Sequence, residues 1–109
     1  MHELSITQGV IEGVCEAVPE GKILRVTLEI GRLSGVVPES IRFCFDLCAQ
    51  GTRVDGAGLD IIEVPGRARC GTCRAELDVD ALVAVCPCGN PFLEVLCGQE
   101  LRIKSVEVT

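Results

Sequence analysis

Apolar residues near the start of the chain recur every three or four positions, the spacing of an amphipathic helix. We predict this helix over residues 5–18, where Ser5 and Gln8 match a capping box that satisfies free amides at a helix start. Pro19 and Gly21 then end it. Its predicted buried face carries Ile6, Val10, Val14, Ala17 and Val18.

From residue 24 the period changes to two, which is typical of a half-buried strand, and the alternation continues to residue 30. A second helix is predicted from Pro38 or Glu39 to Gly51. Two more strands are predicted over residues 59–64 and 101–108, and a change of phase at Ser105 indicates a bulge. The apolar face of the second helix carries Ile41, Cys44, Phe45 and Cys48.

These elements predict an α+β fold, with a small three-stranded sheet packed with two helices and an inserted zinc-ribbon-like domain. We expect an α/β domain over residues 1–66 that is completed by a returning strand at 98–109. The inserted domain is expected over residues 67–97, where residues 74–85 are long enough for one strand out and one strand back.

The composition limits both the core and the partners. The chain has 109 residues, no Trp or Tyr and three Phe, so a core of Val, Leu and Ile would gain from a metal that ties strands together. The net charge of −6 argues against binding to nucleic acid or to an anionic membrane surface. An acidic chain is better suited to cations or to a basic patch on a partner.

Eight cysteines allow either disulfides or metal-binding thiols. The first five residues do not match a signal peptide, and no apolar run approaches the roughly 18 residues of a membrane span. We therefore expect a cytoplasmic protein whose cysteines stay reduced, which favours metal over disulfides.

Four of the cysteines form two close pairs, Cys70/Cys73 and Cys86/Cys88, separated by twelve residues. Two such knuckles can place four sulfurs around one tetrahedral Zn²⁺. Gly71 is expected to give the first turn its freedom, as Gly89 does for the second. Three nearby arginines are expected to offset the net charge of the site, Arg67, Arg69 and Arg74.

Other interpretations of these cysteines remain open. Two disulfides or four free thiols are the plainest, and a rubredoxin-like iron site of an electron carrier also uses two knuckles. A zinc-ribbon interaction module is a further alternative. A site of four cysteines leaves no open coordination position, so it predicts a structural metal and no enzyme activity. The remaining cysteines are interpreted as core residues, namely Cys15, Cys44, Cys48 and Cys97.

His2 is the only histidine. A lone histidine near a terminus is usually solvated, but here the Met1 amine, the backbone amides and the imidazole can converge on one ion. Nitrogen-rich sets of this kind suit Ni(II) or Cu(II), and the Glu3 carboxylate could supply an oxygen. The chain also lacks a G-x-x-x-x-G-K-[ST] phosphate loop, so nucleotide energy would have to come from a partner.

Several segments together resemble the HypA/HybF hydrogenase nickel-incorporation family. The opening Met1–Ser5 is similar, as are residues 30–40 (IGRLSGVVPES) with Phe43 and Phe45, the two cysteine knuckles, and the ending Glu100–Val108. The resemblance spans nearly the whole chain in the expected order. The second knuckle departs from it, because Cys86-Pro87-Cys88 stands where the family commonly shows C-P-x-C.

The resemblance implies a nickel metallochaperone with a nickel-binding α/β domain and an inserted zinc domain. It implies that His2, the Met1 amine and Glu3 bind Ni(II) as transient cargo, while Cys70, Cys73, Cys86 and Cys88 hold a structural Zn(II). The implied partners are the HypB GTPase and the large subunit of [NiFe]-hydrogenase, and in some organisms urease maturation proteins. Both a monomer and a homodimer are compatible with this reading.

Overall fold

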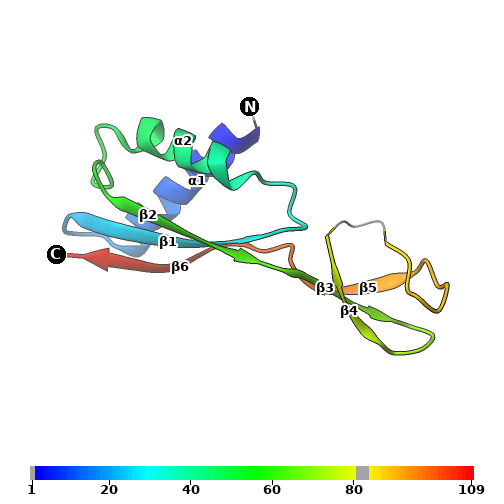
Figure 1. The fold of residues 1–109 in the computed structure, drawn as a ribbon. Helices are drawn as coiled ribbons and strands as arrows, with labels where there is room; N and C mark the ends of the chain where they lie inside the picture. Colours follow the sequence, from blue (N-terminus) through cyan, green and yellow to red (C-terminus); the bar gives the residue numbers. More distant parts are fainter. Residues whose placement is uncertain (1, 81–83) are drawn as a thin grey trace.

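The computed structural model describes residues 2–80 and 84–109, which form two three-stranded sheets in an elongated molecule of 53 × 26 × 17 Å (Figure 1). Two helices lie over the first sheet, and the second sheet extends away from it. The elements in chain order are α1 (His2–Ala17), β1 (Ile23–Gly31), α2 (Pro38–Ala49), β2 (Gly58–Val64), β3 (Gly66–Cys70), β4 (Glu76–Val79), β5 (Leu93–Cys97) and β6 (Leu101–Val108).

The first sheet, called here the helix-covered sheet, has the strand order β2-β1-β6. Strand β1 pairs parallel with β2 and antiparallel with β6, and α2 provides the crossover that a parallel pair needs. The predicted α+β class and the three strands are confirmed. The bulge is confirmed too, because Thr27 pairs with Ser105 and Leu28 with Ile103, which leaves Lys104 as the extra residue.

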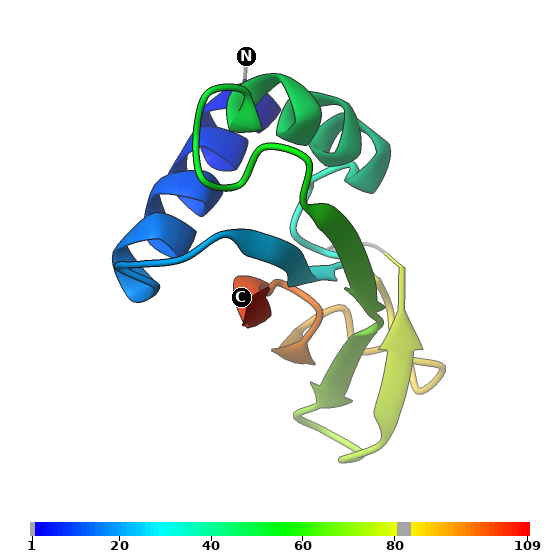
Figure 2. The same ribbon diagram turned by 90° about the vertical axis from the view of Figure 1, so that its left-hand side faces the viewer.

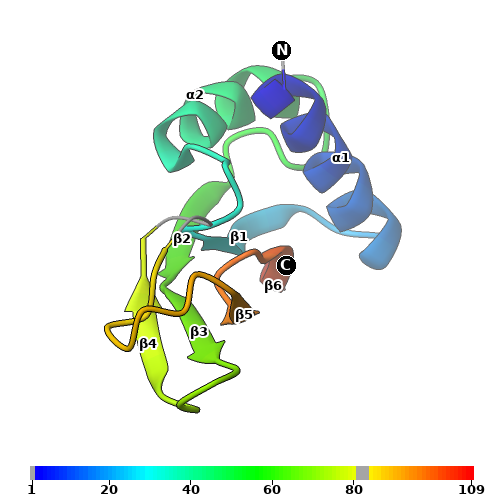
Figure 3. The ribbon, with the colours of Figure 1, turned by 90° about the vertical axis from the view of Figure 1, so that its right-hand side faces the viewer.

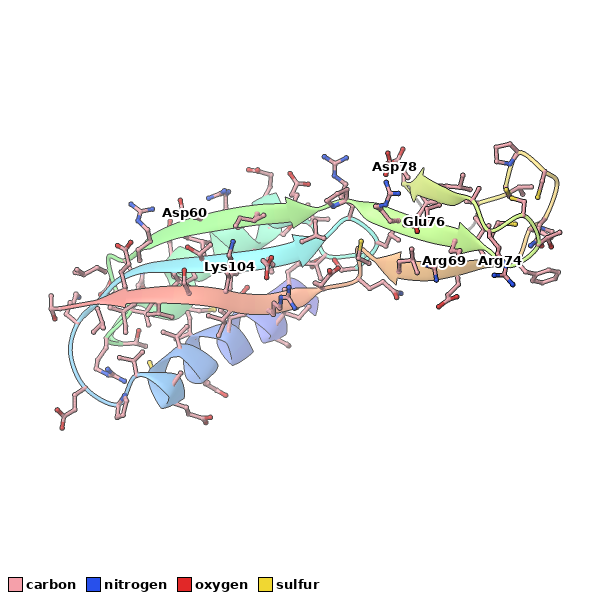
Figure 4. All side chains as sticks on the ribbon, turned by 90° about the horizontal axis from the view of Figure 1, so that it is seen from below. Asp60, Arg69, Arg74, Glu76, Asp78 and Lys104 are labelled. Atoms are coloured by element: carbon pink, nitrogen blue, oxygen red, sulfur yellow. The ribbon has the colours of Figure 1, made fainter. Side chains whose placement is uncertain are left out.

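Both helices pack on one face of this sheet, as the end view in Figure 2 shows. The opposite face is open and polar, and the view from below in Figure 4 shows Asp60 and Lys104 on it. The predicted aliphatic core is confirmed, with Phe45 as its one aromatic residue. The buried members of this core are Ile11, Val14, Ile23, Val26, Leu28, Ile30, Ile41, Phe45, Ala49 and Val54.

Helix α1 begins at His2, so the predicted start at Ser5 and its capping box are wrong. The helix is already formed before Ser5, and the Thr7 hydroxyl donates to the carbonyl oxygen of Glu3 one turn earlier, at 2.7 Å. The predicted face was also partly wrong, because Ala17 is exposed while Thr7 and Ile11 are buried. The helix is therefore rotated slightly from the orientation that its apolar residues alone indicated.

Helix α2 matches its prediction closely, and Cys44 belongs to its buried face with 5% of its surface exposed. Cys15 and Cys48 are half-buried and pack against the same core. Cys97 is different, because it lies outside both cores and its thiol donates to the carbonyl oxygen of Pro65 at 3.5 Å. The core interpretation is thus confirmed for three of these cysteines and wrong for Cys97.

The second sheet, called here the knuckle sheet, is antiparallel with the order β4-β3-β5. Of the two strands expected within residues 74–85, β4 is the outgoing one, and residues 81–83 of the expected return lie outside the described chain. Strand β4 pairs with β3, which precedes the first knuckle, and β5 follows the second. Neither of the two described helices covers this sheet (Figure 3), and its buried core is Leu33, Ala68 and Val79.

The two sheets meet where β2 continues through Pro65 into β3 and where β5 returns through Gly98 into β6. The loop after β1 closes this junction, since Leu33 N–H donates to Gly98 O at 2.6 Å and Gly31 N–H donates to Glu100 O at 2.7 Å. The Leu33 side chain packs into the knuckle-sheet core. Of the described helices, neither is long and apolar enough to cross a membrane.

Candidate metal centre

The four cysteines that were predicted to bind zinc lie together at the far end of the knuckle sheet. Cys70 ends β3, Cys73 lies in the turn that follows, and the other two lie in the loop before β5. All four sulfur atoms are within 4.8 Å of one another. The sulfurs of Cys70 and Cys88 are 3.6 Å apart, as are those of Cys73 and Cys86.

These separations fit a tetrahedral zinc ion. With Zn–S bonds of about 2.3 Å, the sulfurs of a regular tetrahedron lie about 3.8 Å apart. A disulfide requires about 2.05 Å, and all eight cysteines of the chain are free. The alternative of two disulfides is therefore wrong. Iron in a rubredoxin-like site needs the same donor set, so the geometry alone leaves both metals open.

The two knuckles share one feature of backbone conformation. The residue directly after the second cysteine has a left-handed backbone in both knuckles, with φ of 62° at Arg74 and 98° at Gly89. Gly71 is not among the left-handed residues, so the prediction that it supplies the freedom of the first turn is wrong. In that turn the backbone amides of Thr72 and Cys73 both donate to the Cys70 sulfur at 3.4 Å.

These amides and the crowding of the sulfurs set the charge of the site. Hydrogen bonds from the Cys73 backbone and the Asn90 side chain, with a further one from Thr72, lower the pKa of Cys70 to about 5. The Cys88 backbone amide acts in the same direction on Cys86, but burial and the three neighbouring thiols raise the pKa of Cys86 to about 12. The hydrogen-bond donors around Cys70 thus favour its thiolate form, and a bound cation would favour the thiolate form of the other sulfurs as well.

Two of the three arginines expected to offset the charge of the site form ion pairs with acidic residues on β4. Arg67 pairs with Asp78 at 2.7 Å and Arg69 with Glu76 at 3.4 Å, both across the β3–β4 ladder. Figure 4 shows Arg69, Glu76 and Asp78 along these strands, and Arg74 at the turn. Because acidic residues on β4 also attract Arg67 and Arg69, the compensation of the site by these two arginines stays a prediction.

Asn90 is a residue of this site that the sequence did not reveal. Its side-chain amide nitrogen lies 3.4 Å from the Cys70 sulfur and 3.2 Å from the Thr72 hydroxyl. Its oxygen accepts the Phe92 backbone N–H at 3.0 Å, which is an Asx-turn. The one local signal that could have drawn attention to it is the Asn90-Pro91 dipeptide, which is typical of a turn but does not indicate that the side chain reaches the opposite knuckle.

Helix α1 begins at His2, on the side of the helices and away from the knuckle sheet (Figures 1 and 3). Met1 and the side chain of His2 lie outside the described structure. Glu3 is half-buried and lines a hollow between the two helices. The other residues that line it are Glu39, Ser40, Phe43 and Cys44. Of the predicted nickel ligands, the structure therefore places only the Glu3 side chain, and it lies apart from the four cysteines.

Two helices on a mixed sheet, with a four-thiol cluster on a second sheet, define a small metal-binding α+β protein. The family described as "Hydrogenase/urease nickel incorporation, metallochaperone, hypA" matches residues 1–108. The chain belongs to this HypA family. The family is one of nickel metallochaperones that serve hydrogenase maturation, and these are maturation factors and not enzymes.

Individual relatives agree with this assignment. The hydrogenase maturation factor HypA of Geobacter sulfurreducens is 52% identical over 110 residues, which cover 99% of each chain. HypA of Trichormus variabilis is 47% identical over 108 residues, covering 99% of this chain and 96% of the relative. The solution structure of the Ni metallochaperone HypA from Helicobacter pylori shares the fold, with a TM-score of 0.66 at 24% identity over 97% of this chain and 96% of that one.

Proposed function

We propose that this chain binds Ni(II) at its amino terminus and delivers it to the large subunit of [NiFe]-hydrogenase. A structural Zn(II) held by Cys70, Cys73, Cys86 and Cys88 fixes the knuckle sheet. The observation that supports separate sites for nickel and zinc is the closed set of four sulfurs, all within 4.8 Å of one another. Such a set leaves no position at which cargo could enter or leave, so the cargo needs another site.

The proposed nickel ligands are the Met1 amine, the backbone and imidazole nitrogens of His2, and Glu3. This nitrogen-rich set suits Ni(II), and membership in a nickel family favours nickel over copper. Glu3 stands in the first turn of α1, where a carboxylate is favoured by the helix dipole, and it faces the hollow between the helices. A site at a chain end can be opened by a partner more easily than a closed tetrahedral one.

The test is a nickel titration with zinc analysis of the same samples. We expect His2→Ala, and any extension of the chain before Met1, to abolish nickel binding while one zinc per chain remains. Glu3→Gln is expected to weaken nickel binding, whereas Glu12→Gln on the exposed side of the same helix is expected to leave it unchanged. Unchanged nickel affinity in an extended protein would show that the amine is not a ligand. Red protein from metal-replete cells would indicate iron in place of zinc.

Transfer requires partners, and we propose the HypB GTPase and the hydrogenase large subunit, with urease maturation proteins as a second class of client. Two exposed phenylalanines mark separate candidate docking surfaces. Phe43, 71% exposed, lines the hollow beside Glu3, and Leu47 lies one turn further along α2. Phe92, 82% exposed, stands beside the second knuckle. Exposed aromatic residues are common anchors of protein interfaces.

The two surfaces can be separated by matched substitutions. Phe43→Ala should weaken binding to the partner that receives nickel, because Phe43 adjoins the proposed nickel ligand. Phe92→Ala removes an exposed aromatic ring far from the proposed nickel ligands, so it is the control for Phe43→Ala. The same variant tests whether a partner docks on the knuckles. Affinities for purified HypB and large subunit, measured by calorimetry, assign each partner to one surface or exclude both surfaces.

The domain division and the compartment also form part of this proposal. We propose that residues 1–66 with 98–109 form the nickel-binding domain, and that residues 67–97 form the zinc-binding domain. This division is supported by the two separate sheets and their separate buried cores. Eight free thiols suit a reducing compartment, so we propose the cytoplasm as the place of action.

A further inference from the structure

The two knuckles differ in how many backbone amides they can direct at sulfur. The first is a C-x-x-C turn, and Cys70 receives N–H groups from both Thr72 and Cys73. The second is a C-x-C turn whose middle residue, Pro87, has no N–H to donate. Among the described residues, the one backbone amide that acts on Cys86 is that of Cys88. The shorter knuckle is therefore held by fewer hydrogen bonds of its own.

Asn90 ends the short turn and reaches across to the other knuckle. Its backbone closes the turn, since Cys86 N–H donates to Asn90 O at 2.9 Å. Its side chain then lies against the first knuckle, where the amide nitrogen is 3.4 Å from the Cys70 sulfur and 3.2 Å from the Thr72 hydroxyl. One residue thus contacts both cysteine turns.

The orientation of the Asn90 amide follows from its other contacts. The Phe92 N–H requires an acceptor and finds the Asn90 oxygen at 3.0 Å, which places the amide nitrogen toward the sulfur. The same nitrogen also lies 3.1 Å from the Phe92 carbonyl oxygen. A flipped amide would set its oxygen against both the sulfur and that carbonyl, and would leave the Phe92 N–H facing a donor. The donor role of Asn90 toward Cys70 is therefore fixed by the loop itself.

We propose that Asn90 is a positioning residue of the zinc centre that fastens the short C-x-C knuckle to the longer one. It gives the Cys70 thiolate a third N–H donor, after those of Thr72 and Cys73, and it does so from the opposite turn. This inference rests on the proposed zinc site. It adds a specific role for a residue outside the four ligands.

The test compares the zinc affinity of three variants by competition with a chromophoric chelator. Residues that orient metal ligands typically contribute about 10- to 100-fold to affinity. We expect Asn90→Asp to weaken zinc binding at least about tenfold, because it keeps the shape but points a carboxylate at the thiolate. The zinc affinity of Asn90→Ala should lie between those of Asn90→Asp and wild type. Gln8→Ala, which removes an exposed side-chain amide from α1 and leaves the knuckle sheet untouched, is the control, and its zinc affinity should stay within about twofold of wild type.

A spectroscopic readout separates positioning from general loss of folding. In the cobalt-loaded protein, the sulfur-to-cobalt charge-transfer band should shift in Asn90→Ala, because the Cys70 sulfur loses a hydrogen bond. The band should stay unchanged in Gln8→Ala. Equal zinc affinity and an unshifted band in both Asn90 variants would overturn the inference while leaving the zinc site intact. If wild-type protein bound neither zinc nor cobalt, the proposed function itself would fail instead.

Discussion

The backbone of Gly98 lies directly against Gly31 at the junction of the two sheets. A β-carbon built on Gly31 would be 1.9 Å from the carbonyl oxygen of Gly98, so no other residue fits without movement of the backbone. Leu33 N–H donates to that same oxygen at 2.6 Å. The close approach therefore joins the loop after β1 to the strand that returns from the metal centre.

The first prediction concerns this contact. Gly31→Ala should lower the free energy of unfolding by about 1–3 kcal/mol or more, because overpacked sites force the backbone apart. Gly9→Ala is the control, since no atom lies within 4 Å of its added β-carbon and the residue is in a helix. That change should stabilise the protein by about 0.5–1 kcal/mol. Urea unfolding followed by circular dichroism measures both, and a neutral Gly31→Ala would show that the junction is loose.

The sequence predicted the helix-covered sheet well, because its elements carry long and regular apolar patterns. Strand β1 buries Val26, Leu28 and Ile30, and the period of two was clear. The knuckle sheet was harder to predict, because the buried residues of β3 are only Gly66, Ala68 and Cys70. A strand of five residues that begins with Gly66, directly after Pro65, gives almost no periodic signal. It forms because two flanking strands and the cysteine cluster hold it.

In the candidate metal centre too, the features set by neighbouring residues were predicted, and the contacts between distant residues were missed. The four cysteines were predicted from spacing, which is a local property of the chain. The pairing of Arg67 with Asp78 and the reach of Asn90 to Cys70 were not, because both cross between separate segments. The positive φ of Arg74 was also missed, since a left-handed backbone usually indicates glycine or asparagine.

The second prediction concerns Arg53, which follows α2 and caps the end of α1. Its guanidinium donates to the carbonyl oxygens of Cys15 at 2.9 Å and Gly21 at 3.1 Å, and also to that of Val18. Cations at a helix C-terminus satisfy carbonyls that have no partner within the helix. Arg53→Met should therefore lower the free energy of unfolding by about 1–2 kcal/mol.

Two controls define the role of the guanidinium. Arg53→Lys keeps the charge but cannot reach several carbonyls with one nitrogen, so it should recover only part of the loss. Arg42→Met removes an arginine with one hydrogen bond, to Leu59 O, and should cost less than Arg53→Met. Thermal unfolding of the three variants ranks their losses of stability. Equal losses of stability in Arg42→Met and Arg53→Met would contradict a capping role for Arg53.

The third prediction is a dependence of stability on pH. Arg102 donates to Glu29 at 2.5 Å, and this hydrogen bond holds the pKa of Glu29 below its ordinary value of 4.5. A depressed pKa in the folded state means that the pair stabilises the fold above about pH 4.5, and that this contribution is lost as the pH falls through the folded-state pKa. Glu29→Gln should lower the melting temperature at pH 7, and the difference from wild type should shrink toward pH 3.

The neighbouring pair on the same open face gives a control for this titration. Arg25 and Asp60 also form an ion pair, at 2.9 Å, but both side chains are about half exposed, whereas the Glu29 side chain is 16% exposed. Exposed pairs contribute little to stability, so Asp60→Asn should change the melting temperature less at pH 7. A constant gap between wild type and Glu29→Gln from pH 7 to pH 3 would show that packing, and not ionisation, accounts for the effect.

The fourth prediction concerns metal removal. The knuckle sheet has three buried core residues, Leu33, Ala68 and Val79, against ten in the helix-covered sheet. So small a core cannot by itself hold three strands in place, while structural zinc contributes roughly 10–16 kcal/mol in small peptides. We therefore expect chelation of the metal under reducing conditions to unfold residues 66–97 and to leave the helix-covered sheet folded.

Amide resonances measured by two-dimensional NMR follow the two parts separately. After chelation, signals from β3, β4 and β5 should collapse toward random-coil positions, and those from β1 and β2 should keep their dispersion. Restored zinc should bring the first set back, and a Cys97→Ser variant should behave like wild type because Cys97 is not in the cluster. If the knuckle sheet kept its dispersed signals without metal, three buried side chains and strand pairing would suffice, and the proposed structural role of zinc would be wrong.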